Sequence, residues 1–338
     1  MSHATAARPQ DSAGPAPLRV PGSVRRTSSI DVSWPDGRAG NARLIGRARD
    51  VFTPASGGAP IRCSEDAFDA RLHQDRSIAA IESQPSRPAL ARLVGARAGG
   101  GLRQALEQAA PDERRLGTPL YLILDDIAGT SLVSNWAWSH WSPDWLAEVR
   151  ATYANADPAK TLRNMESVCI GFAPGSSAFD PEHERRPTPV AELRNPDDPQ
   201  GWHAFTEQAG AIGMRRARRI DVWRDQGLIV IDSAFQDSAT TPAGGRVAVH
   251  EYRLGATADA QTLQLLSIDA DARVLPHREC TAAPANLSRL IGAPLPTLRE
   301  KVLAELRGVA GCTHLNDALR ALAEVPVLMR HLTGELAR

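Results

Sequence analysis

Short runs of alternating apolar and polar residues, bounded by Gly, Pro and Asp, recur in two parts of the chain and predict β-strands. In the amino-terminal part the expected strands are Ser29–Trp34, Ala42–Phe52 and Ser77–Ile81. In the carboxy-terminal part they are Arg219–Trp223, Leu228–Phe235, Val247–Leu254 and Leu263–Ile268. Strands therefore gather in two separate groups.

Helical spacing of apolar residues follows each group of strands. The helices expected after the first group are Ala89–Val94, Leu102–Ala110 and Leu120–Val133. Those expected after the second group are Leu287–Ile291, Leu295–Leu306 and His314–Leu322. Strands that are followed by helices, without alternating with them, predict an α+β fold in which helices cover one face of an antiparallel sheet.

Three blocks of sequence occur twice, in the same order. RRTSSIDVSWPDG (25–37) aligns with RRARRIDVWRDQG (215–227), and LARLVGA (90–96) aligns with LSRLIGA (287–293). GTPL (117–120) aligns with GCTHL (311–315) after one deletion. These blocks predict two tandem copies of one unit, related by a pseudo-two-fold axis. The alternative is that ordinary strand and helix patterns resemble each other by chance.

The repeats divide the chain into four segments. Residues 1–23, rich in Ala, Pro, Gly and Ser, are predicted to be a disordered arm. Residues 24–133 and 214–338 form the first and second repeat. Residues 134–213 are an insertion that begins with tryptophans and ends in an exposed Pro-rich loop, 181–199.

Composition narrows the class of protein. The 338 residues include 39 Lys and Arg and 39 Asp and Glu, and a formal net charge of zero argues against a nucleic-acid partner held by a global field. The four cysteines show no CxxC spacing, which fits free thiols in a reducing cytoplasm. No apolar run approaches the roughly 18 residues of a membrane helix. We therefore expect a cytoplasmic protein with no nucleic-acid or membrane partner, and a homodimer is left open.

Longer blocks resemble a known family. GRARDVFTP (46–54), GTPLYLILDDIAGTSLVSNWAW (117–138), WRDQGLIVIDSAFQDS (223–238) and GCTHL (311–315) resemble the bacterial family catalogued as domain of unknown function 2889, over about residues 24–330. The resemblance implies no settled reaction. Because some members sit among genes for the breakdown of aromatic compounds, it implies a phenolic or aromatic ligand. Pro119 stands in the first copy where His314 stands in the second, so chemistry that rests on GCTHL belongs to the second copy.

Four of the seven tryptophans lie within ten residues, between Trp136 and Trp145. At helical spacing Trp138 and Trp141 share one face, while Trp136 and His140 share another. Trp136, Trp138 and Trp141 are expected to wall a flat aromatic ligand, with His140 as general acid or base. The alternatives are a Trp-rich core, an interface between the copies, and a structural histidine.

Two acidic residues, Asp125 and Asp126, follow the apolar run Leu120–Leu124. A partly buried carboxylate there would have a raised pKa, as an acid/base catalyst requires. Consecutive helical residues point about 100° apart, so at most one of the two would face a shared pocket. The alternatives are a solvated helix face, a helix cap, or half of a divalent-metal site.

Arg47 and Arg49 lie two residues apart on a predicted strand and therefore share a face. Two guanidinium groups on one face could bind a carboxylate or phosphate bidentately. The alternative is a pair of exposed strand charges.

Cysteine and histidine recur together in the second copy, as His277 with Cys280 and as Cys312 with His314. If these segments meet, the four side chains could form a tetrahedral zinc site, and Cys312 with His314 could also form a thiolate pair. The alternatives are buried small thiols and a helix start capped by Thr313. A further cysteine, Cys169, precedes a Gly-rich loop and could be a nucleophile or part of a buried strand.

The leading functional hypothesis is a cofactor-independent enzyme of the lyase or isomerase type that acts on a small aromatic or phenolic compound. His140 and one of Asp125 or Asp126 would move protons, and Arg47 would anchor a polar end of the substrate. No GxSxG, P-loop, GxGxxG or HExxH pattern occurs, and no metal or cofactor is assigned. One alternative is a non-catalytic module that binds a small molecule or a protein through its Trp-rich surface. Another is a metal protein that uses the cysteines and histidines of the second copy.

Overall fold

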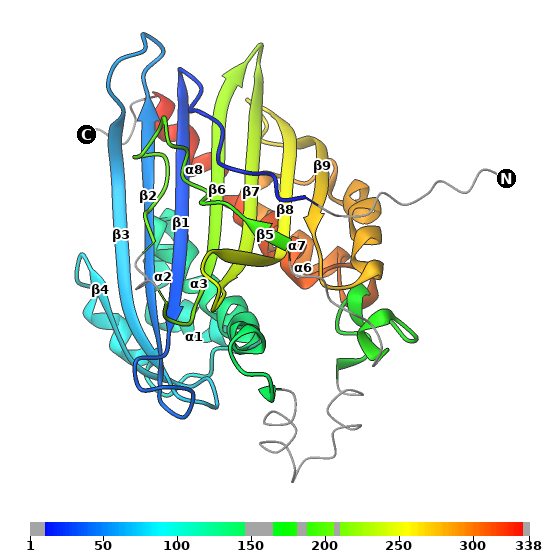
Figure 1. Cartoon of the computed structure of the whole chain (residues 1–338). Coiled ribbons are helices and arrows are strands. Elements are labelled where there is room, and N and C mark those ends of the chain that lie inside the picture. The colour runs from blue at the N-terminus through cyan, green and yellow to red at the C-terminus, as the bar shows by residue number, and fades with distance from the viewer. Residues whose placement is uncertain (1–10, 146–164, 181–187, 206–209, 334–338) are drawn as a thin grey trace, which may run out of the picture.

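The computed structural model describes residues 11–145, 165–180, 188–205 and 210–333. Within these residues one antiparallel sheet of nine strands runs in the order β4-β3-β2-β1-β6-β7-β8-β5, with β9 also paired to β8 (Figure 1). The strands are β1 Ser23–Ser33, β2 Ala42–Thr53, β3 Ile61–Leu72, β4 Ile78–Gln84, β5 Thr188–Val190, β6 Gly213–Asp225, β7 Leu228–Thr240, β8 Arg246–Asp259 and β9 Leu265–Val274. The two predicted groups of strands therefore join into a single sheet.

The join between the two groups is the β1–β6 pair at the centre of the sheet. It is antiparallel and continuous from Ser23 opposite Trp223 to Ser33 opposite Gly213. Ser28 faces Arg218 at its midpoint, so the paired residues are the ones that the repeated RR…IDV block supplies.

The strand β3 was not predicted. Five of the twelve residues in its sequence, IRCSEDAFDARL, are charged, and much of the strand is exposed to solvent. Only Phe68, Ala70 and Leu72 supply the buried apolar positions at a spacing of two, over its second half. The alternation is therefore too short to stand out in the sequence.

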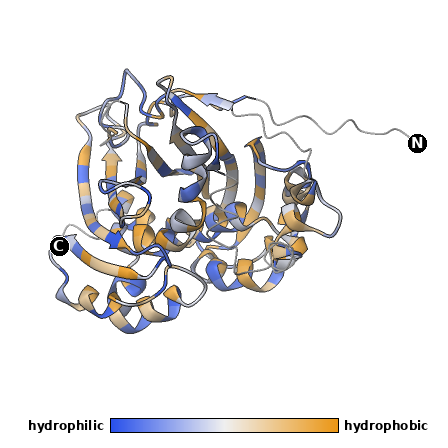
Figure 2. Cartoon of the chain, turned by 60° about the horizontal axis from the view of Figure 1, so that its bottom comes forward, coloured by the Kyte–Doolittle hydropathy of each residue, from blue (hydrophilic) through white to orange (hydrophobic). Residues whose placement is uncertain are grey.

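Helices cover one face of the sheet (Figures 1 and 2), which confirms the predicted α+β class. The α-helices are α1 Leu102–Ala109, α2 Pro111–Leu116, α3 Pro119–Val133, α6 Leu298–Glu305, α7 Thr313–Ala321 and α8 Val325–Thr333. Three predicted helices are 3₁₀ segments instead, namely η1 Pro88–Leu93, the Trp-rich η2 Ser134–His140 and η5 Arg278–Leu290. Pro284 inside η5 removes a hydrogen-bond donor that an α-helix requires.

The opposite face of the sheet, here called the outer face, is crossed by two irregular segments, 11–22 and 188–205. The amide of Ala16 donates to Leu193 O at 2.8 Å, and Arg25 on β1 donates to Pro17 O at 2.9 Å. Trp202 is only 2% exposed against this face. The part of the arm from Asp11 onward is thus bound to the sheet, contrary to a disordered arm over 1–23. The end of the insertion likewise lies against the sheet and includes β5, whereas an exposed loop was expected.

Two apolar clusters fill the space between sheet and helices, one under each half of the sheet. Between them lies a layer of buried charges, because Arg26, Arg216 and Arg218 point from the central strands toward the helices and are each 1% exposed. Figure 2 shows the mixture of hydrophilic and hydrophobic residues along the central strands. Among the described helices none is long and apolar enough to cross a membrane.

Candidate functional site

Three cysteines from distant parts of the sequence meet beside the start of α7. Cys169 precedes the 3₁₀ turn η3 (Ile170–Phe172), Cys280 lies in η5, and Cys312 caps α7. Their residues are 9%, 3% and 2% exposed. The amide of Ile170 donates to Gly311 O at 2.8 Å, which ties the insertion to the loop before α7. The sequence therefore folds so that three of its four cysteines share one buried site.

The sulfur of Cys312 is the centre of this cluster. Tyr252 on β8 donates its hydroxyl to Cys312 Sγ at 3.4 Å, and Cys280 and His314 also form hydrogen bonds with that sulfur. The bond from Cys280, followed by those from His314 and Tyr252, lowers the pKa of Cys312. The same bond to Cys312 raises the pKa of Cys280, because Cys280 holds the shared proton. The hydrogen bonds thus favour the thiolate form of Cys312, and no Lys or Arg among the described residues is one of the main groups that lower its pKa.

The sulfur of Cys169 is held by backbone groups. The amides of Gly171, Phe172 and Thr313 point to it, although burial still raises the pKa of this thiol. Gly171 passes so close that a Cβ there would lie 2.8 Å from Cys280 Sγ and 3.8 Å from Cys169 Sγ. Glycine is thus required for the segment to approach both sulfurs. Amide donors aimed at a sulfur are typical of structural thiolate ligands.

Two stacked imidazoles border the cysteines. The rings of His250 and His314 lie 3.4 Å apart at 20°, and His250 Nδ1 lies 3.3 Å from Asp237 Oδ2. Burial, and then the neighbouring His314, lower the pKa of His250 to about 4, so its ring is neutral at neutral pH. His314 Nε2 is buried without a hydrogen-bond partner. The neutral ring of His250 and the unpartnered Nε2 of His314 both suit a metal site, because a metal ion binds an unprotonated nitrogen.

Among the described residues, Asp237, His250 and His314 form the group of potential metal ligands whose atoms all lie within 4.8 Å of one another. However, Arg216 donates from Nε and Nη2 to the two oxygens of Asp237, at 2.9 Å each. A cation bound to Asp237 would lie beside this guanidinium and be repelled by it. We therefore interpret Arg216, Asp237 and His250 as an outer layer that supports His314 and the sulfurs.

The comparisons with known proteins address this half of the chain. Residues 214–328 match the model of a family described as "Protein of unknown function (DUF2889)". Part of the expected resemblance is thus confirmed, and the match includes Asp237, His250, Cys280, Cys312 and His314. No curated protein and no solved structure matches the chain. The DUF2889 match brings no reaction with it, so function must be argued from the site.

The sequence found part of this site. The sequence-based hypothesis brought His277 and Cys280 together with Cys312 and His314, and the segments that carry these residues do meet. His277 packs its ring against Phe172 at 5.3 Å, whereas Cys169 supplies the third sulfur. The sequence analysis did not single out His250 and Tyr252. These residues lie two apart on β8 and therefore both face the helices. Only that spacing of two could have pointed to them.

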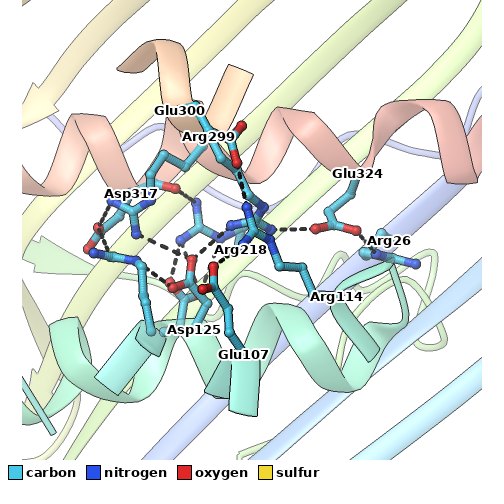
Figure 3. Close-up of polar contacts among 12 residues, drawn as sticks. Arg26, Glu107, Arg114, Asp125, Arg218, Arg299, Glu300, Asp317 and Glu324 are labelled. Carbon is cyan, nitrogen blue, oxygen red and sulfur yellow. Dashed lines mark hydrogen bonds and ion pairs between the residues drawn. The ribbon is translucent and has the colours of Figure 1, made fainter. Parts of the chain in front are cut away.

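The two acidic candidates are held in buried ion pairs, and Figure 3 shows those of Asp125. Burial opposes ionisation of Asp125, but the charges of Arg320, Arg299 and Arg103 outweigh it and hold the Asp125 pKa well below its ordinary value. The expected raised pKa is therefore wrong for Asp125.

Asp126 does have a raised pKa. Burial raises it more than Arg218, whose Nη2 lies 2.7 Å from Asp126 Oδ1, lowers it. Both carboxylates contact arginines of the sheet or the helices.

The Trp-rich segment lies at the end of α3. Trp138 packs edge-on against Trp34 at 5.5 Å, and Trp141 Nε1 donates to Thr240 O at 2.9 Å. The His140 ring lies 4.6 Å from the Trp136 ring, and burial lowers the His140 pKa. Within the described residues no hydrogen bond or ion pair joins His140 to Asp125 or Asp126.

Arg47 and Arg49 share a face, as predicted, but it is the outer face of the sheet. Arg47 donates to Asp31 Oδ2 at 2.9 Å and to Ala204 O at 2.6 Å, and Arg49 donates to Gln200 O at 2.5 Å. The sheet therefore separates both arginines from Asp126, and the single pocket that was expected to join them does not form.

Proposed function

We propose that this chain binds a transition-metal ion of the zinc type, with Cys169, Cys280, Cys312 and His314 as ligands. The observation that carries the proposal is the convergence of three cysteines from three segments at one histidine. Three thiolates and one imidazole are a common ligand set of structural zinc sites. The metal would join the insertion, η5 and α7, and so stabilise this end of the fold.

Burial favours a metal over an organic substrate. Cys312 and Tyr252 are 2% and 0% exposed, so a substrate could reach the sulfur only after the covering segments moved. An ion needs no cavity beyond its own ligands, and the four side chains would close around it from the positions they hold beside Gly171. A divalent ion would also compensate the negative charge that Cys312 and Cys280 share, which is costly to bury alone.

The outer layer supports the same ligand set. Arg216 fixes Asp237, Asp237 fixes His250, and the His250 ring stacks on His314. Packing of this kind behind a ligand histidine fixes the orientation of its ring. His250 acts in this proposal as a positioning residue and not as a ligand.

The test is the metal content of the purified full-length chain after reconstitution with Zn²⁺ under reducing conditions. We expect one zinc per chain in the wild type, and loss of tight binding in Cys169→Ser, Cys280→Ser and Cys312→Ser. The matched control is Cys63→Ser, because Cys63 is the one cysteine that is exposed. A wild-type chain that binds no zinc, or serine variants that bind it as tightly, would disprove the proposal.

A second candidate function is binding of a small aromatic compound at η2, with or without the acid/base catalysis expected from His140. It is favoured by the buried, unpartnered His140 Nε2 and Trp138 Nε1, which lie beside half-buried tryptophan rings. Phenol should quench tryptophan fluorescence saturably, and Trp136→Ala should abolish the effect. A linear, unsaturable response in the wild type would remove this candidate.

We also propose that the two halves arose by tandem duplication and are related by a pseudo-two-fold axis through the Ser28–Arg218 pair. Two ion pairs support this. Arg25 Nε lies 2.6 Å from Asp221 Oδ1, and Arg215 Nε lies 2.5 Å from Asp31 Oδ1, so each copy's arginine binds the other copy's aspartate. Strand order supports it too, because β1 to β4 and β6 to β9 extend outward from the centre in the same sequence.

A further inference from the structure

A buried group of basic side chains lies on the outer face of the sheet, far from the cysteines. Arg47 and Arg49 on β2 and Arg215 on β6 surround His203, which is 6% exposed. Backbone carbonyls of the segment 200–204 anchor all three guanidinium groups. The arginines are therefore fixed in place by a structure built around them.

Several donors of this group have no partner. Both ring nitrogens of His203 and the Nε atoms of Arg47 and Arg49 are buried without a hydrogen bond. Buried polar atoms without partners are rare in folded proteins, since each costs about 1–3 kcal/mol. A ligand that accepts hydrogen bonds would remove this cost.

The charges of the group are not balanced by the protein. Asp31 is shared by Arg215 and Arg47, with N–O distances of 2.5 and 2.9 Å. Glu65 is paired with Arg62 at 2.5 Å. Arg49 makes no ion pair with any described residue, and Glu65 acts on it only from a distance. Among the described residues the three guanidinium groups therefore have one ion-pair partner between them, the carboxylate of Asp31. Burial, and then Arg49, Arg47 and Arg215, lower the pKa of His203 far below its usual value, so its ring is neutral and adds no charge.

We propose that Arg47, Arg49 and His203 bind the carboxylate group of a small organic acid. The two Nε–H groups and one ring N–H supply three donors for two oxygens, and one negative charge balances Arg49. A phosphate would bring additional oxygens for which these residues offer no further buried donor. The site is independent of the metal proposal, because it shares no residue with the cysteine cluster and lies on the other face of the sheet.

The test is calorimetric titration of the full-length chain with sodium acetate at constant ionic strength, with sodium sulfate as the comparison. Acetate should bind the wild type saturably, and Arg49→Met should weaken it about tenfold or more, as expected for loss of a charged hydrogen bond. Arg43→Met is the matched control, because Arg43 lies on the same face of β2 but pairs with Asp69 in solvent. It should bind acetate as the wild type does.

A substitution for Arg49 could unfold the chain, so His203→Gln provides a second variant. Glutamine keeps a donor and an acceptor but lacks the ring geometry. His203→Gln should therefore weaken acetate binding, whereas Arg43→Met should bind acetate as the wild type does. Absence of acetate binding in the wild type, equal binding by Arg49→Met, or equal binding of sulfate would each overturn the carboxylate site.

Discussion

The two halves of the sheet each carry a buried arginine, aspartate and histidine in contact, and the two histidines hold opposite proton states. In the first half Arg26 lies 2.6 Å from Asp50, which lies 3.2 Å from His331 of α8. Burial disfavours the charged ring, but hydrogen bonds with Asp50 and Cys63 raise the His331 pKa to about 9. In the second half His250 has a pKa of about 4.

The difference comes from what each ring meets beyond its aspartate. His331 lies near the surface beside the exposed Cys63, whereas His250 is fully buried against a second imidazole, His314. The same arginine–aspartate pair thus supports a cation in one half and a neutral ring in the other. Only the neutral form is compatible with a neighbouring metal site, which agrees with the ligands proposed beside His250.

The largest effect on the free energy of unfolding is expected when Asp50 and Asp237 are replaced, one at a time. Asp50→Asn leaves both Arg26 and the cationic His331 without their shared partner, and should cost about 3–5 kcal/mol at pH 7. Asp237→Asn should cost less, because His250 is neutral and only Arg216 loses charge compensation. Urea unfolding in the presence of a chelator measures both, and the gap should narrow at pH 10, where His331 is neutral. Equal losses at both pH values would contradict the assigned proton states.

A smaller effect on the free energy of unfolding is expected when the protonated ring of His331 is removed. Its pKa in the folded chain, about 9, exceeds the usual unfolded value of about 6.5, so its stabilising effect is complete below about pH 6.5 and is lost as the pH rises through 9. His331→Gln should therefore destabilise the chain by about 2 kcal/mol at pH 6 and by nothing above pH 9.5. The exposed His73 gives a control, His73→Gln, for which the curve should follow the wild type. A constant difference across this pH range would show that His331 acts through packing alone.

His250 should give the opposite slope. Because its folded pKa of about 4 is depressed, the unfolded chain binds its proton first, and stability should fall as the pH drops from about 6.5 to 4. His250→Gln should flatten this part of the stability curve by about 2–3 kcal/mol. An unchanged slope between pH 4 and 6.5 would mean that this ring is charged in the folded chain.

The smallest effect is expected at Gly171. A methyl group there would meet Cys280 Sγ at 2.8 Å, so Gly171→Ala should destabilise the chain by about 1 kcal/mol through overpacking. It should also weaken zinc binding, because it pushes Cys280 away from Cys169. Gly255→Ala is a control for added methyl groups, since nothing lies within 4 Å of a Cβ there. Zinc affinity that is unchanged in Gly171→Ala would weaken the assignment of Cys169 and Cys280 to one site.

The sequence predicted the class of fold and part of the site. The same physical reasons explain both the correct and the wrong predictions. Alternation revealed strands such as β7, in which apolar residues face a core. It failed for β3, and it started β6 only at Arg219, because the partners of the buried arginines before that residue come from α3 and α7. Asp125 was misread for the same cause: its neighbours in sequence are apolar, while Arg299 and Arg320 arrive from the other end of the chain.

The most direct measurement of the central claim is X-ray absorption at the zinc edge of the reconstituted, reduced chain. The account predicts three sulfur neighbours at about 2.3 Å and one nitrogen at about 2.0 Å, and loss of one sulfur in Cys169→Ser. A spectrum with only nitrogen and oxygen neighbours would contradict it, and would move the metal to Asp237, His250 and His314.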